Sequence, residues 1–263
     1  MEGGIITGLA EIFELDIPLK DRALLAQKAE NEFVGVQCGI MDQFVNIHGR
    51  KDQALKLDCR SLEFELYPFK QEDIRIVLCD TNVRRELASS EYNIRRKQCE
   101  AGVTYLARHN PEIQSLRDVG HDLLDDNRSE MDEIIYKRCK FVLQENERVQ
   151  KACKDLQNGD IASFGRRMYA SHAGLRDMYQ VSCAELDILV DAASKIDGVL
   201  GSRMMGGGFG GCTINLVKEA AVQNFVDQII EIYLEKTTKT VDIYKTKISG
   251  GAEVLSLENK NGW

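Results

Sequence analysis

The spacing of hydrophobic and polar residues predicts two helices at the start of the chain. Residues 3–15 follow a helical pattern. Asp16 and Pro18 then supply a capping residue and a proline near the start of a second helix, which we expect to run to about Phe33.

Alternating patterns predict strands in the next part of the chain. Between residues 53 and 68, apolar residues alternate with polar ones on both sides of a turn-like segment at 58–61, which is typical of two paired strands. Residues 74–79 form a short, continuous apolar run, as expected for a buried strand.

Helical patterns dominate the middle of the chain. We expect a helix over 90–108 and a mostly helical region over 129–179, with an interruption near Asn158 and Gly159. A further helix is expected over 184–195.

The last part of the chain mixes both kinds of element. A strand, a glycine-rich loop and a second strand at 212–217 precede an amphipathic helix, and a final strand is expected within 241–257. The apolar face of that helix consists of Val222, Phe225, Val226, Ile229 and Tyr233. Because strands and helices do not alternate strictly, the pattern predicts an α+β architecture.

Charge and composition exclude several classes of function. The net charge of −8 argues against nucleic acid as the main ligand, because binding to a phosphate backbone needs a basic surface. No apolar run approaches the roughly 20 residues that span a bilayer, and the N-terminus lacks the basic stretch of a secretory signal. The eight cysteines show no zinc-type spacing. We therefore expect a cytoplasmic protein that binds neither nucleic acid nor membrane.

The segment from Glu30 to Phe44 contains the first candidate site. Asp42 follows Gly39, which permits close backbone approach, and lies near the start of a helical run, so its carboxylate could accept a hydrogen bond from a substrate hydroxyl. Alternatively, Asp42 is a helix N-terminal aspartate stabilised by the helix dipole. Glu30, near the end of the preceding helix, could serve a metal ion or be a solvated surface residue.

A glycine-rich loop at 201–212 contains the second candidate site. Five of the six residues from Gly206 to Gly211 are glycine, which indicates positive φ angles or contacts too close for a Cβ. The spacing satisfies GxGxxG, but a dinucleotide-binding motif opens a helix, whereas 212–217 looks like a strand. Two interpretations remain: a backbone nest for an anionic ligand, or a tight structural turn.

The third candidate is Tyr92, near the start of the helix expected over 90–108. Its hydroxyl and the face of its ring could contact a sugar. Alternatively, the side chain is partly buried and makes a local hydrogen bond.

Taken together, these segments resemble the galactokinase family of GHMP small-molecule kinases. The resemblance rests on AENEFVG, CGIMDQF, SSEYNIRR, SHAGLRDMY with VSCAELD, and GSRMMGGGFGGC, which occur in the family's order over nearly the whole chain. Mevalonate and homoserine kinases share a glycine-rich third motif but not the CGIMDQF and SSEYNIRR wording, so the resemblance is specific.

The resemblance implies ATP-dependent phosphorylation of D-galactose to galactose 1-phosphate, with Mg²⁺ accompanying ATP. It implies that Asp42 faces the anomeric hydroxyl, as a general base or as an electrostatic orienter, and that Glu30 binds magnesium. Gly39 and Tyr92 match sugar-contacting positions. The residues that match the motif closing on the nucleotide-bearing loop are Gly206, Gly207, Gly208, Gly210 and Gly211.

The resemblance also implies the fold and the domains. Residues 1–68 would be the remainder of a ribosomal-S5-like N-terminal domain. Residues 69–263 would form a ferredoxin-like GHMP kinase C-terminal domain with a helical insertion.

Two motifs of the family do not occur in this sequence: a GEHTDY-like sugar motif with its preceding catalytic arginine, and a P-x₃-G-L-S-S-S-A phosphate loop. Both normally lie upstream of the part that matches. The chain is therefore interpreted as a C-terminal portion, through truncation, a misassigned start or a deliberately isolated domain. Without those phosphate-binding groups, residues 1–263 alone are expected to have little or no kinase activity. Apolar surface that has lost its partner would favour self-association.

Three other functions stay open at this point. One is a kinase for a related sugar, such as N-acetylgalactosamine or galacturonate, because the residues that read the sugar's substituents are partly upstream. Another is a non-catalytic sensor of galactose and ATP, against which the presence of Asp42, Glu30 and Tyr92 argues. The last is a non-catalytic remnant or interaction module.

Overall fold

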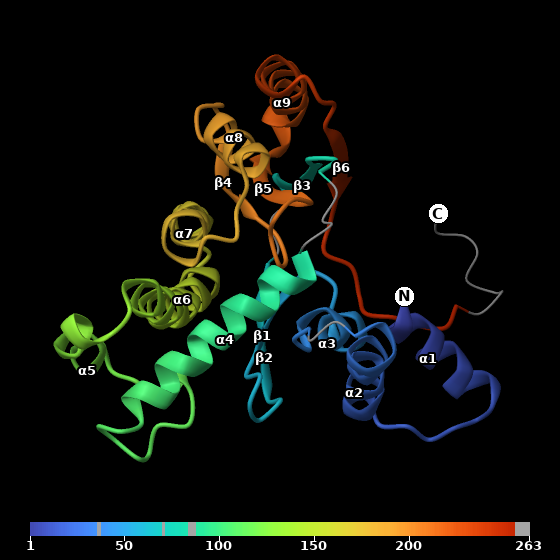
Figure 1. Cartoon of the computed structure of the whole chain (residues 1–263). Coiled ribbons are helices and arrows are strands. Elements are labelled where there is room, and N and C mark those ends of the chain that lie inside the picture. The colour runs from blue at the N-terminus through green and yellow to red at the C-terminus, as the bar shows by residue number, and fades with distance from the viewer. Residues whose placement is uncertain (36–37, 70–71, 84–87, 256–263) are drawn as a thin grey trace. The chain divides into compact units, whose positions relative to one another are not determined.

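The computed structural model describes residues 1–35, 38–69, 72–83 and 88–255, with the side chains of 88–90 left out. The chain divides into two compact units, residues 1–70 with 247–263 and residues 71–246. Figure 1 shows the elements of both.

The described residues of the first unit form three α-helices and a β-hairpin. They are α1 (Glu2–Ile12), α2 (Leu19–Lys28), α3 (Met41–His48), β1 (Gln53–Leu57) and β2 (Phe64–Pro68). The strands are antiparallel, with Leu57 opposite Phe64, which confirms the pair expected over 53–68. The unit's small core contains Ala23 from α2 and Phe44 and Ile47 from α3.

Both N-terminal helices are confirmed, but their ends differ from the sequence-based expectation. Helix α1 ends at Ile12, and Glu14 has a positive φ of 51°, which interrupts the pattern before residue 15. Pro18, rather than Asp16, is the N-cap of α2, and no side chain caps that helix. A π-helical turn, Ala29–Val34, continues directly from α2. Gly35, with a φ of 80°, is its C-cap.

Residues 247–255, which follow β6 (Asp242–Thr246), belong to the first unit rather than to the second. Their backbone bonds to the end of α3 and the following turn: Ala252 N–H donates to Asn46 O at 2.6 Å, and Gly251 N–H donates to Gly49 O at 3.0 Å. The compact unit of residues 71–246 is therefore shorter than the C-terminal domain of 69–263 that the resemblance implied. The domain limits of 1–68 and 69–263 stay a prediction.

The second unit is built on a four-stranded antiparallel sheet with the order β4–β5–β3–β6. Its strands are β3 (Ile74–Asp80), β4 (Val199–Met204), β5 (Cys212–Lys218) and β6 (Asp242–Thr246). The buried strand expected at 74–79 is therefore the central β3, and the final expected strand is β6.

Helices α8 (Ala184–Ala193) and α9 (Val222–Thr237) pack against this sheet and enclose its main core (Figure 1). The apolar face predicted for the last helix is confirmed, because all five of its residues are buried: Val222, Phe225, Val226, Ile229 and Tyr233. They meet Val77 and Cys79 of β3, both fully buried, and burial raises the pKa of the Cys79 thiol to about 12.

A helical insertion joins β3 to β4. It contains α4 (Ala88–Leu106), α5 (His121–Asp126), α6 (Glu133–Gln157), α7 (Ile161–Gly174), a π-helical turn at Leu175–Tyr179, and α8. The side chains of Asp132 and Asp160 cap the N-termini of α6 and α7. The interruption expected near Gly159 is confirmed, since Gly159 has a φ of 70° between these two helices.

The α+β class is thus confirmed, together with the helical insertion that the resemblance implied. Among the helices that the structure describes, none combines the length and the apolar character needed to cross a bilayer.

Candidate active site

The predicted site residues lie in two groups, one in each unit. In the first unit, the π-helical turn after α2 carries Glu30, whose carboxylate contacts two side chains. Gln43 Nε2 donates to Glu30 Oε1 at 2.6 Å, and the Cys38 thiol donates to Glu30 Oε2 at 3.3 Å. The wide turn therefore brings Glu30 beside the start of α3.

Gln43, like Cys38, belongs to this group and was missed by the sequence reasoning. Its side chain is buried, and its Oε1 atom has no hydrogen-bond partner among the described residues. A buried acceptor without a partner costs free energy unless a ligand or water satisfies it. Gln43 lies inside the CGIMDQF motif, directly after Asp42, so the motif itself was the available signal.

Cys38 is half-buried between the same groups. Burial, together with the hydrogen bond to Glu30 and its negative charge, raises the pKa of the Cys38 thiol. A raised pKa keeps the sulfur protonated, so that it serves as a hydrogen-bond donor rather than as a nucleophile.

Asp42 lies in the first turn of α3 and is exposed. Within the described residues, its carboxylate has no hydrogen-bond or ion-pair partner, and it is close to the N-terminal end of the helix dipole. Gly39 precedes it in an open position, where an added Cβ would meet no atom of the described residues within 4 Å. Both residues are therefore accessible to a ligand, although the same geometry also suits a simple dipole-stabilising aspartate.

In the second unit, the glycine-rich loop connects β4 to β5. Four of its glycines have positive φ angles, from 73° at Gly206 to 128° at Gly210. Thr81, at the end of β3, fixes the far side of the loop, because its N–H and its hydroxyl both donate to Gly211 O, at 3.0 and 2.8 Å.

The glycines of this loop differ in what surrounds them. A Cβ at Gly208 would lie 1.9 Å from Val181 O, and one at Gly210 would lie 2.9 Å from Val83 O. At Gly206, by contrast, no atom of the described residues lies within 4 Å of the added Cβ, and at Gly207 the one described neighbour is Tyr92 Cδ2, at 3.9 Å. The two interpretations of the loop therefore apply to different residues: Gly208 and Gly210 are needed for a tight turn, whereas Gly206 and Gly207 leave their backbone open.

Tyr92 in α4 is 37% exposed and lies beside Gly207. One turn further along the helix, Arg95 donates hydrogen bonds to Tyr179 O and Gln180 O, and its guanidinium lies 5.6 Å from the centre of the Phe209 ring. Helix α4 is thereby joined to the glycine loop. The ring and hydroxyl of Tyr92 are available at this junction.

A buried polar network supports the start of the loop and was also missed by the sequence reasoning. His172 of α7 accepts a hydrogen bond from Met204 N–H through Nδ1 at 3.3 Å, and its Nε2 lies 3.1 Å from Asp187 Oδ1. The hydroxyl of Ser182 donates to the same oxygen. Burial raises the pKa of Asp187, but the nearby His172 imidazole and the Ser182 hydroxyl outweigh it and lower that pKa overall. These residues lie in SHAGLRDMY and VSCAELD, segments quoted for the resemblance without a stated role.

Metal ligands are sparse in the part of the chain that the structure describes. No group of three His, Cys, Asp or Glu side chains there could hold a metal ion. Mg²⁺, however, is commonly bound by one or two carboxylates together with substrate phosphates and water. The single carboxylate of Glu30, next to the unsatisfied Gln43 oxygen, fits that mode of binding and not a complete protein cage.

Comparison with known families identifies the class of protein. Residues 1–50 match the family of GHMP kinase N-terminal domains, and residues 152–235 match the family of GHMP kinase C-terminal domains. Together with the α+β fold, these matches place the chain among the relatives of the GHMP kinases.

Individual relatives define the family more narrowly. The chain is 45% identical to the galactokinase of Roseiflexus sp. over 90% of its length, and 40% identical to the galactokinase of Thermotoga maritima over 94%. It also resembles the crystal structure of Lactococcus lactis galactokinase complexed with galactose, with a TM-score of 0.91 and 36% identity over 97% of the chain. The chain belongs to the galactokinase family.

The chain spans only part of each of these relatives. It covers 60% of the Roseiflexus protein, 68% of the Thermotoga protein and 66% of the Lactococcus chain. Family membership and the activity of residues 1–263 are therefore separate questions.

Proposed function

We propose that the chain contributes the sugar-facing and magnesium-facing residues of a galactokinase, which transfers the γ-phosphoryl group of ATP to the anomeric hydroxyl of D-galactose. The observation that carries this proposal is the identity of 40–45% to galactokinases over most of the chain. The exposed Asp42 at the start of α3 supplies the chemical group that such a transfer requires.

In this proposal Asp42 acts on the hydroxyl that attacks the phosphorus atom. Phosphoryl transfer depends mostly on positioning and on charge stabilisation, so a carboxylate that accepts a hydrogen bond from the hydroxyl orients it and takes up its proton as the new bond forms. Asp42 has no internal partner among the described residues, so that its oxygens are available for this bond. Gly39 leaves room for the sugar beside it.

Glu30 would hold Mg²⁺, which neutralises charge on the phosphates of bound ATP. Gln43 and Cys38 both donate hydrogen bonds to Glu30, and these bonds fix the direction of its carboxylate. The two donors therefore position Glu30 and do not contact the reacting atoms themselves.

The second unit would contribute to both substrates. The open backbone at Gly206 and Gly207 supplies N–H groups to the side of the nucleotide, and Gly208, Gly210 and Gly211 give the loop its shape. Tyr92, next to Gly207, would contact the sugar.

Two alternatives are distinguished by their chemistry. A kinase for N-acetylgalactosamine or galacturonate would use the same residues on a sugar with another substituent. A sensor would bind galactose and ATP without transferring phosphate.

We propose the cytoplasm as the site of action, because ATP is the phosphoryl donor.

The experiment compares residues 1–263 alone with a joined protein. In the joined protein, the segment of the Thermotoga maritima galactokinase that precedes its match to this chain is placed before residues 1–263. We expect little or no activity from residues 1–263, whose sequence has no P-x₃-G-L-S-S-S-A loop, and galactose-dependent release of ADP from the joined protein.

A panel with galactose, N-acetylgalactosamine and galacturonate then tests the substrate. A preference for another sugar would overturn galactose as the substrate. Binding of galactose and ATP by the joined protein without ADP release would favour the sensor.

A further inference from the structure

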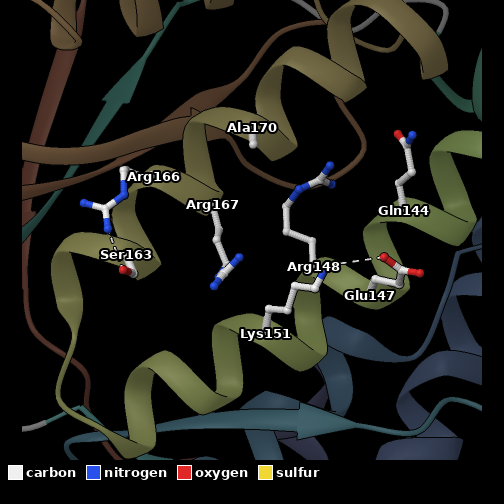
Figure 2. A pocket seen from close by; sticks show the side chains of 8 residues that line it. All are labelled: Gln144, Glu147, Arg148, Lys151, Ser163, Arg166, Arg167 and Ala170. Atoms are coloured by element: carbon white, nitrogen blue, oxygen red, sulfur yellow. Dashed lines mark hydrogen bonds and ion pairs between the residues drawn. The ribbon is translucent and has the colours of Figure 1, made fainter.

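A basic pocket lies between α6 and α7, in the helical insertion of the second unit (Figure 2). Its volume is about 540 Å³, within the usual range for pockets that hold small molecules. Its lining residues are Gln144, Glu147, Arg148, Lys151, Ser163, Arg166, Arg167 and Ala170.

Positive charge dominates this lining. Arg148 and Lys151 come from α6, and Arg166 and Arg167 come from α7, whereas Glu147 is the one acidic residue among them. The whole chain carries a net charge of −8, so a pocket with this balance runs against the average of its surface. The carboxylates of Glu145, Asp155 and Asp160 lie outside the lining and offset part of this charge.

The two central arginines are held from outside the pocket. Arg148 pairs with Glu145, and Arg167 pairs with Asp155 through two nitrogens of its guanidinium. A guanidinium has five N–H donors, so both arginines keep donors for a ligand while their carboxylate partners fix their directions. In Figure 2, Arg148 points from α6 toward α7, and Arg167 points from α7 toward α6.

At Arg148 the surroundings disfavour the charged guanidinium, although Glu145 pairs with it. Burial lowers the pKa of Arg148, and the positive charges of Arg203 and Arg167 lower it further. The side chain of Arg148 is only 18% exposed, so water compensates for little of this repulsion. A bound anion would relieve it.

Lys151 and Arg166 complete the pocket at more accessible positions. Lys151 lies 3.4 Å from Glu147 in an exposed pair, which is weak in water, and Arg166 Nη2 donates to the Ser163 hydroxyl at 2.6 Å. The Asp160 carboxylate accepts the N–H of Ser163 at the start of α7, so this helix end is already capped. The anion-binding capacity therefore comes from the side chains rather than from the helix N-terminus.

We propose that this pocket binds the phosphate group of a small phosphorylated metabolite. The planar forks of Arg148 and Arg167 match phosphate oxygens, and Lys151 and Arg166 add charge at the rim. The volume exceeds what a phosphate ion alone would fill, which leaves room for the organic part of the metabolite beside Gln144 and Ala170. The site is built from one unit only, and its occupancy does not depend on the proposed kinase reaction.

Isothermal titration calorimetry of residues 1–263 tests this proposal with inorganic phosphate, pyrophosphate and glucose 6-phosphate. The variant K151Q/R166Q removes two positive charges at the pocket. The matched control K154Q/K195Q removes two exposed charges outside its lining. Circular dichroism and thermal unfolding verify that each variant folds.

We expect saturable binding of glucose 6-phosphate that weakens with added salt. Loss of two charge-assisted contacts should weaken it about tenfold or more in K151Q/R166Q, with less than a twofold change in the control. Equal affinity for inorganic phosphate and glucose 6-phosphate would overturn the assignment to a metabolite. Absence of saturable binding, or equal losses in the two variants, would overturn the site itself.

Discussion

Alanine at Gly208 is the sharpest test of how the glycine loop is built. Gly208 has a φ of 84°, and an added Cβ would lie 1.9 Å from Val181 O and 2.9 Å from Met204 Cε. The backbone of Val181 would have to move, although its oxygen accepts a hydrogen bond from Phe209 N–H at 2.8 Å.

The expected cost follows from three contributions. The left-handed conformation costs about 1–2 kcal/mol for a residue with a Cβ, the weakened hydrogen bond costs about 1 kcal/mol, and relief of the clash costs about 1–3 kcal/mol. G208A should therefore lose roughly 3–6 kcal/mol of the free energy of unfolding. Alanine at Gly206, where φ is 73° and the described residues leave 4 Å around the added Cβ free, should lose only about 1–2 kcal/mol.

Urea unfolding of both variants, followed by circular dichroism, measures this difference. The kinase assay of the joined protein adds a second comparison, in which G206A should weaken the apparent affinity for ATP despite its smaller effect on stability. Equal losses of stability in G206A and G208A would refute the division of the loop into a structural part and an open part.

Three further predictions concern the first unit. E30Q should raise the Mg²⁺ concentration needed for half-maximal activity of the joined protein, and an unchanged magnesium titration would contradict the role of Glu30. Burial, with a smaller effect of Arg50, lowers the pKa of His48 in the folded state. Below about pH 6.5 the unfolded state therefore binds more protons than the folded state, and the free energy of unfolding should fall on acidification. The difference between the urea midpoints at pH 7 and pH 5.5 should be smaller in H48F than in the parent protein. Ile12 and Phe13 are 73% and 64% exposed, so light scattering should show association of residues 1–263 that I12S/F13S reduces; a monomer at high concentration would count against it.

Much of the fold could be predicted because its elements have regular periods. The apolar face of α9 and the β1–β2 hairpin follow directly from the spacing of apolar residues in the sequence. In both, apolar side chains recur at the period of the helix or the strand. The π-helical turn that carries Glu30 has no such period. The return of 247–255 to the first unit depends on backbone hydrogen bonds between distant segments, which side-chain patterns do not encode.

The candidate site was predictable only in part, for a similar reason. Asp42, Glu30 and the glycine loop stand out through residue type and motif. Gln43 and His172 act through burial and through the atoms that they contact, and these properties appear only in the folded chain. The basic pocket joins residues of two helices that lie side by side, so no single stretch of sequence indicates it.

The central claim is that Asp42 serves the reaction rather than only the helix. Asp21 provides the matched control, because it also lies in the first turn of a helix, α2, and is exposed. D42N and D21N should therefore lose similar, small amounts of stability, about 0.3–1 kcal/mol each.

The decisive measurement is the kcat for galactose phosphorylation by the joined protein carrying either substitution. We expect D42N to lower kcat by about 10²–10⁴-fold, the range for loss of a group that handles a proton in the transition state, and D21N to leave it unchanged. A D42N protein that is folded and retains the kcat of its parent would contradict the account.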